Sequence, residues 1–151
     1  MSTAPQSKAA AVEFDHWRSR RADDDHKVAF ADSVQPVWDA GLVELVDTDH
    51  RVCDEVRLVS TPGHTPGHVS VLIASRGEEA LITGDFLHHP VQMARLDWMS
   101  SADDDPERAR QTRRDVFARL AGTSTLLIGT HFATPTAGRV VRDGGAFKLE
   151  A

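Results

Sequence analysis

The sequence contains a single cysteine, Cys53, among its 151 residues. One cysteine excludes an intramolecular disulfide, and a reducing compartment fits. We expect Cys53 to be a small, half-buried residue rather than a metal ligand. No stretch is long and apolar enough to span a bilayer, and residues 1–11 lack the continuous apolar segment of a signal peptide. These absences predict a cytoplasmic protein with no membrane-spanning segment.

The chain also lacks an excess of positive charge. Its formal net charge of -6 argues against nucleic acid and anionic membrane surfaces as partners. Basic residues cluster at 18–21 and 108–119, but acidic neighbours interrupt both clusters, so each is interpreted as a solvated helix face. The hydrophobic share of 40% and the charged share of 26% are those of an ordinary soluble globular protein.

No internal repeat or interdomain linker divides the chain. Residues 1–11 are rich in Ala, Ser, Pro and Gln and are expected to be disordered, which leaves residues 12–151 as one domain. Helices are predicted at 12–21 and at about 26–40, with the three aspartates of 23–25 capping the second helix. Pro36 disfavours a continuous second helix, because proline removes a backbone donor.

From Leu42 onward, short runs rich in β-branched residues alternate with turn residues, and this pattern predicts strands. The expected strands cover residues 42–46, 56–60, 69–74, 80–83, 125–130, 139–142 and 146–149. One helix interrupts them: Asp105 caps it, Pro106 suits its first turn and Gly122 ends it. Its expected apolar face consists of Ala109, Thr112, Val116, Phe117 and Leu120. The fold class is therefore α/β (α+β).

Polar side chains follow three of the predicted strands. His64-Thr-Pro-Gly-His68 follows the run that ends near Ser60, and later runs lead to Asp85 and to His131. Residues that emerge past the ends of adjacent strands can converge on one edge of a sheet. Two imidazoles and a carboxylate suit a borderline divalent metal such as zinc, iron or manganese. The sequence therefore predicts part of a metal-dependent hydrolase; the alternatives are loop histidines and a turn-capping aspartate.

Three motifs, Thr61-Pro-Gly-His-Thr-Pro-Gly-His68, Ile82-Thr-Gly-Asp85 and Gly129-Thr-His131, resemble the later metal motifs of the metallo-β-lactamase-fold hydrolases in order and spacing. That superfamily includes glyoxalase II and the N-acyl-homoserine lactonases. The resemblance covers the chain from about Val12 to its C-terminus. It implies an αββα sandwich of two similar halves.

The resemblance also implies roles for individual residues. His64 matches a ligand of metal site one, Asp85 the catalytic carboxylate that bridges two ions, and His131 a ligand of site two. His68 matches a position that supports the ligand loop by hydrogen bonding. Zinc is the first choice of metal, with iron and manganese as alternatives. In the family, two ions lower the pKa of a shared water, which attacks an ester, lactone, thioester or related bond of a small-molecule substrate.

His88, His89 and Phe132 are candidates for a substrate pocket. For the two histidines the alternative is an exposed loop, and for Phe132, as for Phe86, it is core packing. Several lactonases carry a tyrosine three residues after the bridging aspartate. This chain has His88 there and no tyrosine at all, which argues against a lactone substrate.

The family's first motif, His-x-His-x-Asp-His, is absent upstream of His64. We therefore expect a partial sandwich, mainly the second half and incomplete at its N-terminal side, that holds one ion or none and is inactive by itself. The alternatives are a non-catalytic metal-binding or interaction fragment, and a half-site completed by a partner chain. A sheet without its partner sheet exposes an apolar face, which predicts marginal stability or a homo-oligomer.

Overall fold

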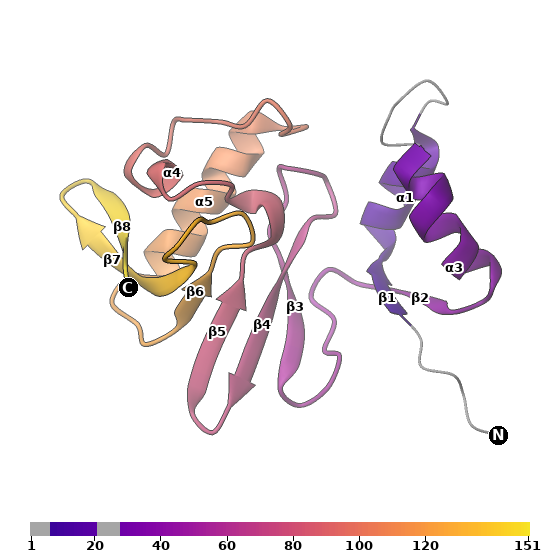
Figure 1. Cartoon of the computed structure of the whole chain (residues 1–151), viewed down its shortest axis with the longest axis horizontal. Coiled ribbons are helices and arrows are strands. Elements are labelled where there is room, and N and C mark those ends of the chain that lie inside the picture. Colours follow the sequence, from indigo (N-terminus) through magenta and orange to yellow (C-terminus); the bar gives the residue numbers. More distant parts are fainter. Residues whose placement is uncertain (1–6, 21–27) are drawn as a thin grey trace.

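The computed structural model describes residues 7–20 and 28–151, which form two sheets and the helices that accompany them (Figure 1). A small N-terminal unit contains a two-stranded sheet, and a larger unit contains a six-stranded sheet. The N-terminal unit consists of β1 (Ser7–Ala10), α1 (Ala11–Ser19), η1 (Phe30–Val34), α3 (Gln35–Asp39) and β2 (Val43–Val46). The mixed α/β class expected from the sequence is confirmed.

Strand β1 corrects the prediction that the N-terminal segment is disordered. It pairs in parallel with β2, from Ser7 opposite Val43 to Ala10 opposite Val46. Its composition is poor for a strand, but β2 supplies backbone partners and Ala10 is buried. Residues 1–6 lie outside the described part of the chain, so the structure differs from the expectation over residues 7–11, where β1 passes into α1.

The second predicted helix is interrupted, as Pro36 suggested. A π-helical turn, η1, runs into α3, and Pro36 lies in the first turn of α3, where its missing N–H costs little. The proposed aspartate cap at 23–25 lies outside the described residues. Phe14 of α1 packs on Phe30 with ring centroids 5.4 Å apart and on Trp38 at 4.6 Å, which joins α1 to the second helical segment.

The six-stranded sheet follows the chain order β3-β4-β5-β6-β7-β8. Its strands are β3 (Val56–Ser60), β4 (Val69–Ser75), β5 (Glu78–Ile82), β6 (Leu126–Ile128), β7 (Ala137–Asp143) and β8 (Ala146–Glu150). Strands β5 and β6 are parallel, with Ile82 opposite Ile128, and the other neighbouring pairs are antiparallel. Both parallel strands therefore end at the same edge of the sheet, and the chain continues from them to Asp85 and His131.

Helix α5 (Pro106–Leu120) lies behind the sheet in Figure 1 and closes the core on that face. Asp105 accepts a hydrogen bond from the Arg108 N–H at 2.9 Å, which confirms the predicted cap. The predicted apolar face is buried as expected. The interpretation of 108–119 as a solvated face is wrong at Arg113, which is fully buried beside the apolar residues.

The other face of the sheet is apolar but only partly buried. Ile73 lies opposite Ala80 and Ala80 opposite Leu126; one row along, Val71 lies opposite Ile82. These residues alternate with the core residues of the same strands, as a strand's period of two requires. We call this set of side chains the open sheet face; Ile73 on it is 36% exposed.

Two further predictions concern isolated features. Cys53 is exposed, so the expectation of a half-buried residue is wrong. It lies in a turn before β3, where no element covers it. Among the described residues, no helix has the length and apolarity needed to cross a membrane.

Candidate metal centre

The loop that carries His64 and His68 is seated on the start of α5. Gly63 has a φ of +134°, and a Cβ there would lie 2.2 Å from the backbone nitrogen of Ala109. The Thr112 hydroxyl donates to the Pro62 carbonyl at 2.6 Å, and the Asp105 N–H donates to the Gly63 carbonyl at 2.9 Å. Only a glycine permits this close approach, so the Pro/Gly composition of the loop sets the position of His64.

His68 supports the Asp85 turn directly. Its Nε2 accepts a hydrogen bond from the Asp85 N–H at 2.8 Å, while its Nδ1 lies 3.0 Å from the Thr61 carbonyl. An acceptor on one side and a donor on the other fix the neutral Nδ1–H tautomer. Burial lowers the pKa of His68, which favours the same neutral ring. His68 thus contacts the backbone of Asp85, as expected for a supporting residue.

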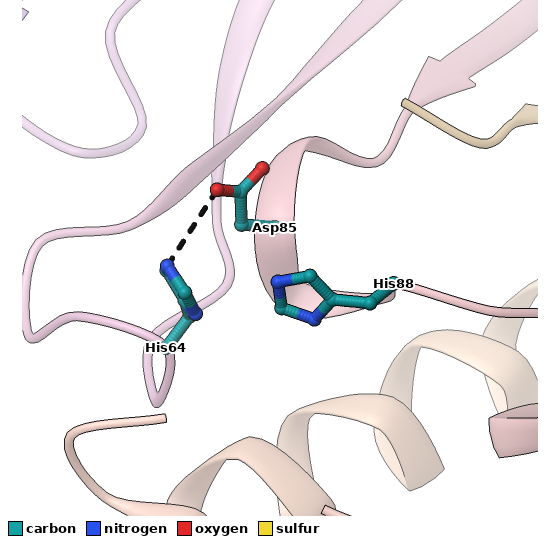
Figure 2. Close-up of side chains that lie close together, drawn as sticks. All are labelled: His64, Asp85 and His88. Atoms are coloured by element: carbon teal, nitrogen blue, oxygen red, sulfur yellow. Dashed lines mark ion pairs between the residues drawn. The ribbon is translucent and has the colours of Figure 1, made fainter. Parts of the chain in front are cut away.

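Asp85 lies on the short helix η2 (Gly84–Phe86), directly after β5. Its Oδ2 is 3.5 Å from His64 Nε2. His88 joins these two residues: one ligand atom from each of the three lies within 4.8 Å of the others. Figure 2 shows the three side chains gathered between the His64 loop and the η2 turn. The structure therefore brings His88 beside two of the predicted ligands.

His131 approaches the other oxygen of the same carboxylate. Its Nε2 lies 2.9 Å from Asp85 Oδ1, and its ring stacks on His88 at 5.0 Å with an interplanar angle of 20°. His131 follows β6, and Asp85 follows β5, so the parallel pairing of these strands brings the two together. Asp85 thus has one histidine on each carboxylate oxygen.

Electrostatics keeps Asp85 ionised. Burial by itself would raise the pKa of Asp85, but the hydrogen bond and charge of His131, with His64 and His68, lower it below the ordinary value. Burial and the neighbouring His64 lower the pKa of His88, which favours its neutral ring. The centre therefore offers an anionic oxygen pair and a neutral imidazole, both suited to a cation.

The donor set fits a divalent metal. The Nδ1 atom of His88 is buried with no hydrogen-bond partner among the described residues, and one nitrogen of the same ring lies within 4.8 Å of a ligand atom of His64 and of Asp85. Two atoms bound to one zinc lie at most about 4.2 Å apart, given bonds of about 2.1 Å. The three ligand atoms lie within 4.8 Å of one another, so they must draw together to share one ion. Imidazole and carboxylate ligands suit zinc and accept iron and manganese.

The remaining pocket candidates lie differently. His89 is exposed, and its Nδ1 accepts from the N–H of Val91, the first residue of the short helix α4 (Val91–Ala94), at 3.0 Å. Phe132 is buried in the core cluster, packed over Gly129, and Phe86 is buried in the same cluster. Of the three candidates, only His88 lies beside the centre, with its ring 5.1 Å from that of His64.

Sequence reasoning missed Asp103 and Arg113. Asp103 Oδ1 lies 3.3 Å from His64 Nδ1, and Arg113 Nη1 lies 3.6 Å from Asp103 Oδ2. Both side chains are 0% exposed. A signal was available, because Arg113 falls on the apolar face of α5, where an arginine requires a buried partner.

The family model of the metallo-beta-lactamase superfamily matches residues 5–131. The chain therefore belongs to the metallo-beta-lactamase superfamily, as the three motifs indicated. No curated protein sequence matches the chain.

Solved structures support the same fold. The hydrolase AbOPH of the beta-lactamase superfamily superposes with a TM-score of 0.77 at 22% identity, covering 95% of this chain and 54% of that one. AidC, a dizinc quorum-quenching lactonase in complex with a homoserine product, gives 0.76 at 20% identity, with 95% and 53% covered. A probable metal-dependent hydrolase from Staphylococcus aureus gives 0.62 at 18%, with 74% and 41% covered. The chain thus spans about half the length of these structures.

Proposed function

We propose that the chain carries the metal centre of a metal-dependent hydrolase, with His64, Asp85 and His131 as ligands. The observation that supports this most strongly is the carboxylate of Asp85, whose two oxygens face different histidines. A carboxylate that binds two ions offers each oxygen to one of them. His88 adds a donor beside His64, so the first position has three protein groups and the second has two.

Three protein ligands with one open position are typical of a catalytic zinc site, whereas two hold an ion weakly. We therefore expect one firmly held ion per chain, at His64, Asp85 and His88, and only weak binding at the second position, where Asp85 and His131 are the ligands. Zinc is the metal we favour, in keeping with the dizinc lactonase AidC, and iron and manganese are the alternatives. The proposal keeps one domain, incomplete at its N-terminal side, but begins it at Ser7 rather than at residue 12, because β1 pairs with β2. It also includes incomplete ligation of the second position by Asp85 and His131.

A bound divalent metal would lower the pKa of water and polarise the bond to be hydrolysed. The chain's own residues have separate tasks in this scheme. Asp85 supplies negative charge at the centre, and His68 holds the Asp85 backbone through the hydrogen bond to its N–H. His88 and His131 stack on each other beside Asp85, and the proposal places a small-molecule substrate against their rings.

The proposed substrate is a small molecule with an ester, lactone, thioester or related bond. AidC was solved with a homoserine product, which makes lactones worth testing, although His88 stands where several lactonases have tyrosine. A second candidate function is a non-catalytic metal-binding module. Only Asp85 and His131 are available to hold a second ion, and a dinuclear reaction needs two firmly held ions. This weak second position favours the non-catalytic module.

The experiment combines metal titration with hydrolysis. Zn²⁺ is titrated into the metal-free chain by calorimetry, and hydrolysis of ester, lactone and thioester substrates is followed with and without the ion. One ion per chain with metal-dependent turnover supports the hydrolase. Binding without turnover supports the metal-binding module. The metal centre itself is refuted if no Zn²⁺ binds.

We also expect the chain to associate with a second copy, or with a complementing chain, through the open sheet face. Substituting Ile73→Lys places a charge in that face beside Ala80, and should lower the mean mass measured by sedimentation equilibrium. Val52→Lys is the matched control, because Val52 is 43% exposed but lies in the turn before β3. A wild-type chain that sediments as a monomer would contradict association with a second copy, and equal effects of the two substitutions would contradict the role of the open sheet face.

A further inference from the structure

A buried ion pair lies directly behind His64. Asp103 comes from the loop before α5 and Arg113 from α5 itself, and both side chains are 0% exposed. Asp103 Oδ1 faces His64 Nδ1 at 3.3 Å, and the Ser100 N–H donates to Asp103 Oδ2 at 3.1 Å. The pair therefore contacts the ring nitrogen of His64 opposite the one that faces Asp85.

Arg113 also contacts the η2 turn, which carries Asp85. Its Nη1 donates to the Phe86 carbonyl at 3.3 Å, one residue after Asp85, and its Nη2 donates to the Trp98 carbonyl at 3.4 Å. One guanidinium thus connects the partner of His64 with the backbone that follows Asp85. Helix α5 carries Arg113 and so fixes its contacts with Asp103 and with the Phe86 carbonyl.

Stability alone gives a poor account of this pair. Arg113 Nε is buried with no hydrogen-bond partner among the described residues, so part of its desolvation is uncompensated. Buried ion pairs can often be replaced by packed apolar residues with no loss of stability. The position of the pair is more informative: Asp103 contacts the proposed ligand His64, and Arg113 contacts the turn that carries Asp85.

We infer that Asp103, held by Arg113, is a positioning residue that fixes the tautomer and orientation of His64 and thereby strengthens metal binding. An ionised carboxylate only accepts hydrogen bonds, so Nδ1 of His64 must carry the proton. That leaves the lone pair of Nε2 facing Asp85, at 3.5 Å from Oδ2. The inference rests on the proposed function, in which His64 is a ligand.

The contacts of Asp103 agree with an ionised carboxylate. Burial would raise the pKa of Asp103, but the hydrogen bonds from His64 and from the Ser100 N–H, with the charge of Arg113, lower it. Carboxylate partners behind metal-bound histidines typically account for about 10–100-fold in metal affinity.

The first readout needs no metal. Nitrogen-15 NMR of the metal-free chain, at alkaline pH where the ring is neutral, reports which nitrogen of His64 is protonated. We expect the Nδ1–H tautomer in the wild type. The Nε2–H tautomer in the wild type would overturn the inference, whatever the variants do.

The first variant is Asp103→Asn. The second combines Asp103→Asn with Arg113→Met, which removes the buried charge of Arg113 that the first variant leaves unpaired and which could prevent folding. Each should lose the Nδ1–H preference and bind Zn²⁺ about 10–100-fold more weakly. Thr125→Val is the control, because Thr125 is a buried hydroxyl bonded to Glu79, on β5. A folded double variant with the wild-type tautomer and affinity would overturn the inference. A wild-type chain that shows the expected tautomer but binds no Zn²⁺ would refute the proposed function instead.

Discussion

Replacing Asp85 by alanine is expected to abolish metal binding. Both histidine contacts of the centre converge on this carboxylate, His64 on Oδ2 and His131 on Oδ1, so one substitution removes the shared ligand of both positions. Removing a residue that contacts only a ligand, and not the metal, typically costs up to about 100-fold in metal affinity. Removing the ligand Asp85 itself is expected to cost more than that. Calorimetric titration of the metal-free chain measures this loss, and any metal-dependent hydrolysis by the wild-type chain should disappear in parallel.

The fold should survive this substitution. The Asp85 side chain is 40% exposed, and the hydrogen bond from its N–H to His68 does not depend on the carboxylate. Asp143→Ala is the matched control, because Asp143 is an exposed aspartate on the β7–β8 hairpin, paired with Lys148. Wild-type Zn²⁺ affinity in folded Asp85→Ala, or equal losses in the two variants, would contradict the assignment of Asp85.

Replacing Gly84 by alanine is expected to destabilise the chain and weaken metal binding together. Gly84 has a φ of +59°, and a Cβ there would lie 2.7 Å from His68 Nε2, the atom that accepts the Asp85 N–H. The positive φ costs roughly 1–2 kcal/mol for a residue with a side chain. Displacing the half-buried His68 ring costs about 1–3 kcal/mol more, the range for side chains forced into a space that is already filled.

Gly77→Ala separates the two costs. Gly77 has a φ of +83°, but nothing lies within 4 Å of the position its Cβ would take. It should therefore show only the backbone cost, with unchanged Zn²⁺ affinity. Thermal unfolding and metal titration of both variants make the comparison. Equal destabilisation of the two would mean that His68 moves aside freely and does not support Asp85.

The sequence predicted the sheet and its helix well, because their signals are local. The Asp105 cap, the Pro106 first turn and the apolar spacing along α5 each depend on neighbouring residues, and all three are observed. Strand β1 was missed for the opposite reason. Its residues favour no strand by themselves, and only pairing with β2, far along the chain, makes them one.

In the candidate centre, too, the sequence revealed the local features but not the contacts between distant parts of the chain. The loop spacing singled out His64 and His68, and the strand ends singled out Asp85 and His131. Which oxygen of Asp85 each histidine faces depends on the parallel pairing of β5 and β6, which spacing does not reveal.

The neighbours of His64 were hidden for a related reason. Asp103 lies in an acidic run that looks like ordinary solvated sequence, and its contact with His64 spans 39 residues. Arg113 looked like one of several surface arginines until packing placed it beside Asp103. His88 was predicted as a pocket residue, and the structure brings it within ligand distance of His64 and Asp85.

The most direct test is a crystal structure of the chain grown with Zn²⁺, with diffraction recorded on both sides of the zinc absorption edge. The account predicts an anomalous peak between His64, Asp85 and His88, with bonds of about 2.0–2.2 Å to the imidazole nitrogens and the carboxylate. A well-ordered centre with no anomalous peak, or zinc bound only at other histidines, would contradict it.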